Sequence, residues 1–215
     1  MFNVSTPILI SRLITLVIAF TVHEFSHAYV ATAFGDDTAH LNGRLTLNPL
    51  KHLDFLGSIL LLTVGFGWAK PVPINPTVLK EKSRFATMWV SVAGPLSNFF
   101  MAAIAALPIR FGLVNYSTSG TILPTAYTFL VNFIAINLLL LVFNLIPLAP
   151  LDGEKVVEAF IPESIRGGFD AIRPYGSIIL LVLIFALPMI GIDLFQQYMI
   201  PVVQFLIKFL LGATI

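Results

Sequence analysis

His23-Glu24-Phe25-Ser26-His27 is an HExxH motif, and it lies inside the first apolar run of the chain. On an α-helix, residues four apart share one face, so both histidines can reach one zinc ion while Glu24 lies beside it. Two histidines and a glutamate are costly inside a membrane helix unless they serve a site. The pattern therefore favours a zinc centre over the alternative interpretation, a polar contact between helices.

A catalytic zinc ion takes three protein ligands and keeps one position open for water. The chain has no cysteine, so the third ligand must be His, Asp or Glu. The candidate is Asp152, which follows the apolar run 126–148. Its alternative interpretation is a turn residue, because Asp-Gly pairs are common in turns. We expect one Zn²⁺ per chain, bound by His23, His27 and Asp152.

The composition indicates the class of fold that must hold these residues. Hydrophobic residues make up 57% of the 215 residues and charged residues 11%, whereas a soluble domain carries about 25% charged residues. Long apolar runs with so few charges indicate an integral, multi-pass protein of the lipid bilayer. A net charge of +1 gives no broad basic face, so nucleic acid is not expected as a partner.

The apolar runs predict an all-α polytopic membrane protein with about five full transmembrane helices. No repeat or appended soluble domain interrupts them, so we expect a single membrane-embedded domain over residues 1–215. The expected spans are residues 7–33, 85–107, 126–148, 177–192 and 194–211.

One further apolar run, 55–67, is too short to cross a membrane comfortably. As a helix it would reach only about 20 Å, against a hydrocarbon core of about 30 Å. We therefore expect a re-entrant segment or short helix there. Three prolines follow it within residues 68–76, and they favour a small extended or β-like loop near the active site.

The loops on the two sides of the membrane differ in basic residues. If 55–67 does not span, residues 36–84 and 152–175 lie on one side, and Asp152 comes to the same side as the nearer end of the HExxH helix. Basic loops stay cytoplasmic, so we expect the active site toward the cytoplasm and the N-terminus outside. The basic residues on that side are Arg44, Lys51, Lys70, Lys80, Lys82, Arg84, Lys155, Arg166 and Arg173.

Several motifs together make the chain resemble the site-2 proteases, zinc-dependent intramembrane proteases, and most closely the small bacterial members without PDZ or CBS domains. The likeness runs from Val22 to Gly153. Two positions depart from the usual pattern, Phe55 and Ala149, where proline is common. The motifs that carry the likeness are residues 23–29, 43–49, 67–76, 93–98 and 144–153.

The resemblance implies a zinc metalloendopeptidase that cuts membrane proteins, single-pass ones in particular, in or near their transmembrane segments in a bacterial cell membrane. It implies that His23, His27 and Asp152 bind zinc and that Glu24 activates the water. Asn144 matches a family asparagine near the active site, a candidate for binding substrate backbone or the oxyanion. An extended substrate segment could also pair with the loop 70–75. Substrate identity and oligomeric state are left open.

Two other functions fit some of the same residues. A metal or ion transporter could use the intramembrane His and Asp residues as its path, although it would not need Glu24 and no inverted repeat is present. A catalytically inactive binding scaffold is the third. Outside the motif we interpret His40 and His52 as surface histidines. Asn98 is interpreted as a helix-packing residue, and Glu154, Glu158 and Glu163 as solvated loop charges.

Overall fold

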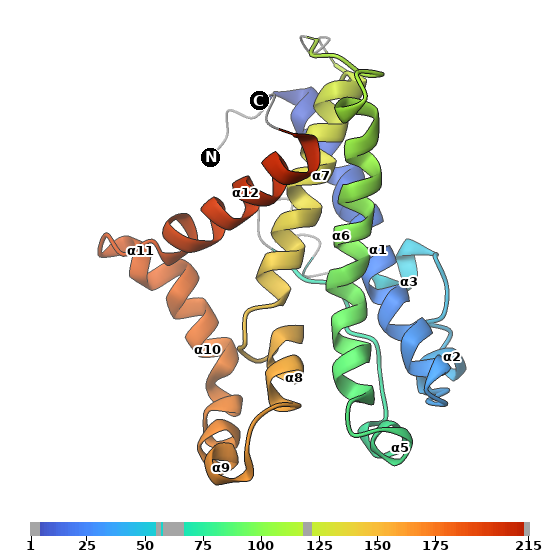
Figure 1. The fold of residues 1–215 in the computed structure, drawn as a ribbon, viewed down its shortest axis with the longest axis vertical. Coiled ribbons are helices and arrows are strands. Elements are labelled where there is room, and N and C mark those ends of the chain that lie inside the picture. Colours follow the sequence, from blue (N-terminus) through green and yellow to red (C-terminus); the bar gives the residue numbers. More distant parts are fainter. Residues whose placement is uncertain (1–4, 55–56, 58–66, 118–121, 213–215) are drawn as a thin grey trace.

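The computed structural model describes residues 5–54, 57, 67–117 and 122–212, and the regular elements in those ranges are all helical (Figure 1). One isolated antiparallel bridge joins Leu53 to Ala69. The prediction of an all-α fold is confirmed. The predicted re-entrant run, 55–67, lies outside the described residues except for Gly57 and Gly67.

Three long helices form the centre of the molecule: α1 (Thr6–Ala33), α6 (Ala86–Arg110) and α7 (Ala126–Asn144). Each packs against the other two. The buried faces of α1 and α6 are rich in small residues, which let helix backbones approach closely inside a membrane. The buried small residues are Ala19, Ala28, Ala31, Ala86, Gly94, Ala102 and Ala106.

Short helices connect and follow this bundle. Asn75 and Thr125 cap the helices that follow them, by accepting hydrogen bonds from the backbone N–H groups of Thr77 and Thr128. The remaining elements are α2 (Thr38–Leu41), α3 (Pro49–His52), α5 (Pro76–Lys82), α8 (Asp152–Glu158), α9 (Glu163–Ile172), the 3₁₀ turn η1 (Arg173–Tyr175), α10 (Gly176–Leu181), the π-helical η2 (Val182–Ala186), α11 (Leu187–Met189), the π-helical η3 (Phe195–Met199) and α12 (Ile200–Leu211).

Among the described residues, 4 helices are long and apolar enough to cross a membrane. They are α1, α6, α7 and the continuous helical segment Glu163–Met189. The fifth predicted span corresponds to a shorter apolar helical stretch, Phe195–Leu211, which reaches about 26 Å at 1.5 Å per residue. The chain is therefore a multi-pass membrane protein.

The C-terminal helices leave the bundle as a splayed hairpin. In Figure 1, α10 and α12 diverge from α11, and α12 returns toward the upper end of α7. Val203, Leu210 and Leu211 of α12 pack with Ile134 and Leu138 of α7 in the apolar core. Only 11% of the most apolar stretch of Glu163–Met189 is buried, against 39% of that of α6. Most of the Glu163–Met189 segment is therefore left to face lipid.

Candidate metal centre

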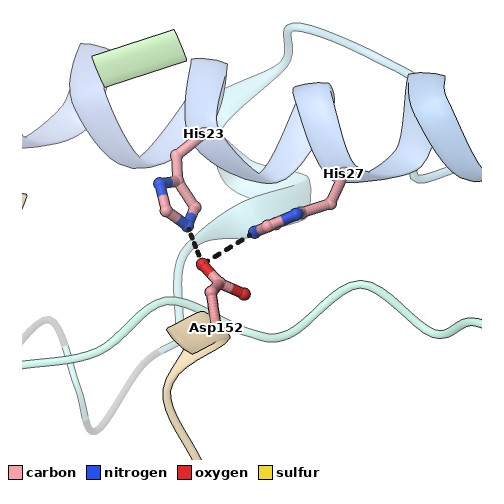
Figure 2. Close-up of side chains that lie close together, drawn as sticks. All are labelled: His23, His27 and Asp152. Carbon is pink, nitrogen blue, oxygen red and sulfur yellow. Dashed lines mark ion pairs between the residues drawn. The ribbon is translucent and has the colours of Figure 1, made fainter. Parts of the chain in front are cut away.

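His23, His27 and Asp152 come together from two separate elements (Figure 2). His23 and His27 lie one helical turn apart on α1, and Asp152 is the first residue of α8. The Oδ2 atom of Asp152 lies 3.2 Å from His23 Nε2 and 3.3 Å from His27 Nε2. The expectation that Asp152 joins the HExxH histidines is thus met by the geometry, across 125 residues of sequence (27 to 152).

The other ring nitrogen of each histidine has its own partner on α6. His27 Nδ1 lies 2.7 Å from the carbonyl oxygen of Val90. A carbonyl can only accept, so His27 Nδ1 carries the proton and a neutral ring keeps the lone pair on Nε2. His23 Nδ1 lies 2.6 Å from Oδ1 of Asn98. Asn98 is fully buried, and it touches a histidine of the site as well as packing between helices.

The chain around Asp152 is held by close backbone packing. A Cβ added at Gly153 would lie 2.3 Å from the carbonyl oxygen of Leu145, and one at Gly176 would lie 2.2 Å from that of Ala149. Gly153 therefore lets the start of α8 pack against Leu145 at the end of α7, and Gly176 lets the start of α10 pack against the turn at Ala149. Pro147 and Pro150 prevent α7 from continuing as helix through this turn.

An ion-pair cluster fixes the rest of α8. The Nη2 atom of Arg173 lies 2.5 Å from Glu154 Oε1 and 2.6 Å from Glu158 Oε2. Glu154 is 3% exposed, so its interpretation as a solvated loop charge was wrong. The carboxylate is buried because the guanidinium of Arg173, from the following helical segment, compensates its charge.

The donor set fits a zinc ion on the evidence of this structure. Two ligand atoms at 2.0–2.2 Å from a tetrahedral zinc ion are roughly 3.4 Å apart, close to the observed separations of 3.2 and 3.3 Å. Oδ2 of Asp152 is buried and has no hydrogen-bond partner among the described residues.

Gly94 leaves the space beside these donor atoms. A Cβ at this position would lie 2.4 Å from His27 Nε2 and 2.6 Å from His23 Nε2. The backbone of α6 therefore passes directly against the two ring nitrogens that face Asp152. Any side chain here would fill the position next to the metal-binding atoms.

Glu24 contacts the extended loop that follows residue 67. Its Oε2 atom accepts a hydrogen bond of 3.1 Å from the backbone N–H of Val72. Glu24 is 8% exposed, and it is not one of the residues whose ligand atoms converge. The expected extended loop near the site is thus present as residues 67–75, which form no regular helix.

The loop is fastened on both sides of Val72. The Lys70 N–H donates to the carbonyl of His52 at 2.8 Å, and the guanidinium of Arg44 donates to the Lys70 carbonyl. Asp36 accepts from the Asn75 N–H at 2.6 Å. Burial raises the pKa of Asp36, but hydrogen bonds from Thr38 and Asn75 lower it below its usual value overall.

His52 is fully buried, and its Nε2 lies 2.7 Å from the Thr46 carbonyl oxygen. Its interpretation as a surface histidine was wrong because the loop around it folds back against α1. His40 is exposed, as expected.

Asn144 lies at the C-terminal end of α7. Its side-chain amide donates to the carbonyl of Leu140, at 2.9 Å, in its own helix. The structure therefore shows this amide directed along α7, and the role proposed for it needs a rotation of the side chain.

An HExxH helix whose histidines meet an aspartate within a bundle of apolar helices defines the class of protein: a membrane-embedded metalloenzyme. Known proteins with similar sequences carry names that agree with this class. The chain is 46% identical over 174 residues to "Putative zinc metalloprotease YwhC" of Bacillus subtilis, covering 79% of this chain and 78% of that protein. It is 30% identical over 173 residues to "Putative zinc metalloprotease Rip2" of Mycolicibacterium smegmatis, covering 76% of this chain and 62% of that protein.

A more distant relative is "Zinc metalloprotease MJ0392" of Methanocaldococcus jannaschii, 26% identical over 148 residues, which cover 69% of this chain and 33% of that protein. No family model matches the chain, and no solved structure does. The chain belongs to the site-2 protease-like family of zinc metalloproteases. Its metal is zinc.

Sequence reasoning missed three features of the site. Gly94 lies in the motif 93–98, but nothing in the motif shows that its missing side chain faces the histidines. The Val90 carbonyl is a backbone group, so no residue type signals its contact with His27. The loop 70–75 was considered only as a partner for substrate, and nothing in the sequence shows that its Val72 N–H donates to Glu24.

Proposed function

We propose that this protein is an intramembrane endopeptidase that hydrolyses peptide bonds in or near the transmembrane segments of other membrane proteins. The observation that carries the proposal is the position of the metal-binding group within an apolar helix. His23 lies 17 residues after the start of α1 at Thr6, or roughly 26 Å along its axis. A helix of about 42 Å therefore carries the site at a depth that the hydrocarbon core of about 30 Å covers.

In this proposal His23, His27 and Asp152 bind the zinc ion and Glu24 is the general base. Bound zinc lowers the pKa of a water molecule and polarises the scissile carbonyl. Glu24 takes the proton of the attacking water and delivers it to the nitrogen of the leaving amine. The Val72 N–H keeps the Glu24 carboxylate oriented while it does so. Burial of the site limits competing water.

The substrate backbone must lie extended beside Glu24 for this chemistry to occur. Asn144 is proposed to donate its amide to that backbone or to the oxyanion, after leaving the Leu140 carbonyl. The loop 70–75 is proposed to run alongside the substrate. Because Val72 already donates to Glu24, pairing through this donor requires that contact to break.

The proposal is tested by presenting one cleavage sequence in two ways. A single-pass membrane protein is reconstituted with the enzyme in liposomes, and the same segment is supplied as a soluble unfolded fusion. We expect cleavage within or next to the transmembrane segment of the first substrate, mapped by mass spectrometry and abolished by a zinc chelator. Cleavage of the soluble form alone would contradict an intramembrane activity.

The metal ligands are tested by zinc content. We expect about one zinc per chain in the purified protein, and loss of zinc in His27→Ala and Asp152→Ala, because each removes one of three donors. Zinc is measured by elemental analysis after dialysis against a weak chelator. Full occupancy in Asp152→Ala would remove Asp152 from the ligand set.

The orientation in the membrane is a further part of the proposal: the site faces the cytoplasm of a bacterial cell. The helices α2, α5 and α9 lie toward one end of the bundle, and the C-terminal end of α6 and the start of α7 lie at the other (Figure 1), which supports basic loops on one side. Basic loops are retained in the cytoplasm.

Orientation is measured by labelling single cysteines, which is clean because the natural chain has none. We expect Leu50→Cys and Lys80→Cys to react only when the reagent reaches the cytoplasmic side. Tyr116→Cys, at an exposed position beyond α6, should react from outside. Labelling of positions 50 and 80 from opposite sides would contradict the arrangement.

A further inference from the structure

Two asparagines inside the bundle connect His23 to the third long helix. Asn98 of α6 and Asn137 of α7 are both fully buried. The Nδ2 atom of Asn98 lies 2.9 Å from Oδ1 of Asn137, and Asn98 Oδ1 lies 2.6 Å from His23 Nδ1. Polar side chains this deep in a membrane bundle are expensive unless each finds a partner.

The hydrogen bond that Asn137 makes at the end farthest from His23 determines the direction of the other hydrogen bonds in this series. Asn137 Nδ2 lies 2.8 Å from the backbone carbonyl oxygen of Phe133. A carbonyl oxygen cannot donate, so the Asn137 group that faces it must be the amide NH₂. The Asn137 oxygen is thereby directed at Asn98.

The same reasoning passes through Asn98 to the histidine. The group of Asn98 that faces the Asn137 oxygen must donate, so it is the NH₂, and the Asn98 oxygen is directed at His23. That oxygen can only accept, so His23 Nδ1 carries the proton. In the neutral ring Nε2 is then left with its lone pair, and Nε2 is the atom that faces Asp152.

We infer that Asn137 is a positioning residue that fixes the metal-binding tautomer of His23 through Asn98. The inference rests on the proposed role of His23 as a zinc ligand. The protein uses two routes to the same end, because His27 is set directly by the Val90 carbonyl, whereas His23 is set by a relay that begins on α7. Without Asn137, the Asn98 amide can turn over and present its NH₂ to His23, which favours the tautomer with the proton on Nε2.

The test compares Asn137→Leu with Asn132→Leu. Asn132 lies on the same helix and donates its amide to the carbonyl four residues earlier, Thr128, at 2.8 Å, as Asn137 does to Phe133. The two substitutions thus remove the same kind of bond from α7, but only one removes the relay. Loss of an outer partner of a metal-binding histidine weakens metal affinity about 10- to 100-fold. We expect the zinc Kd to rise about 10-fold in Asn137→Leu and to stay unchanged in Asn132→Leu.

The tautomer is read directly from the ¹⁵N chemical shifts of His23 in zinc-free protein at alkaline pH. The signal is assigned by its loss in His23→Gln. We expect the wild type and Asn132→Leu to carry the proton on Nδ1. In Asn137→Leu a population with the proton on Nε2 should appear. An unchanged tautomer in Asn137→Leu would overturn the inference.

A double mutant distinguishes an effect through the hydrogen-bond relay from a general packing defect. In Asn98→Asp the side chain has no donor to present, so a carboxylate oxygen accepts from His23 whatever occupies position 137. Adding Asn137→Leu to Asn98→Asp should therefore leave the tautomer and the zinc Kd unchanged. If the added substitution weakens zinc binding as much as it does alone, Asn137 acts by packing and the relay is wrong.

If His23 is not a zinc ligand, the variants would give a different set of results from those expected if only the relay is wrong. If His23→Gln binds zinc with wild-type affinity, the proposed site is wrong irrespective of Asn137. If His23→Gln loses zinc while Asn137→Leu behaves as wild type in both measurements, the zinc site stands and only the relay fails.

Discussion

Glu24→Gln is expected to bind one zinc per chain and to cleave membrane substrates about 10²- to 10⁴-fold more slowly than the wild type, the range that a general base contributes. The substitution preserves size, and the new amide oxygen can still accept from the Val72 N–H, which now reaches Glu24 Oε2 at 3.1 Å. It cannot take a proton from water. Zinc content by elemental analysis and initial rates in liposomes measure the two parts separately.

The control for this variant lies two residues away in the same motif. Ser26 donates its hydroxyl to the Val22 carbonyl of its own helix at 2.7 Å, so Ser26→Ala should retain both zinc and activity. A wild-type rate in Glu24→Gln would show that another group is the base. Loss of zinc in Glu24→Gln would instead place Glu24 among the ligands.

The sequence predicted which residues meet at the candidate site, because that inference needs only helical spacing and the lengths of the apolar runs. The spacing of His23 and His27 requires only a helix, and the structure supplies it in α1. Asp152 was predicted because it should lie at a membrane depth similar to that of the two histidines, and that inference needs only the lengths of the apolar runs. The structure brings its carboxylate to 3.2 Å and 3.3 Å from the two histidines.

The supporting parts of the site were not predictable because they depend on how helices rotate against one another. Asn132, Asn137 and Asn144 all interrupt one apolar run, and each donates its amide to its own helix. Only the packing of α7 against α6 shows that Asn137 meets Asn98. Glu154 was misread for the same reason, because its partner Arg173 is 19 residues away on another element.

The first three spans were predicted better than the last two. The first three agree with α1, α6 and α7 to within a few residues at their starts. The last two were drawn as full helices on hydropathy alone. In the structure the fourth apolar helical segment begins earlier, at Glu163, and runs to Met189, whereas the fifth, Phe195–Leu211, matches the predicted 194–211 to within one residue. The fourth is longer because the polar segment before it is also helical and continues through the 3₁₀ turn Arg173–Tyr175, which hydropathy does not register.

Gly94→Ala is expected to abolish zinc binding, raising the zinc Kd by more than about 100-fold, beyond the usual effect of losing an outer partner. The added methyl would lie 2.4 Å from His27 Nε2 and 2.6 Å from His23 Nε2, so one side must move. The rings cannot retreat without breaking the hydrogen bonds of their Nδ1 atoms to Val90 and Asn98. Isothermal titration of zinc into metal-free protein measures the loss.

Helix propensity by itself predicts no harm from this substitution, which makes the experiment decisive. In the interior of a helix, alanine is more favourable than glycine by about 1 kcal/mol, so Gly94→Ala would be neutral or stabilising if α6 did not pass against the histidines. Gly167→Ala in α9 is the matched control, since its added Cβ meets nothing within 4 Å, and it should bind zinc as the wild type does. Wild-type zinc affinity in a folded Gly94→Ala protein would show that α6 does not form the wall of the metal site.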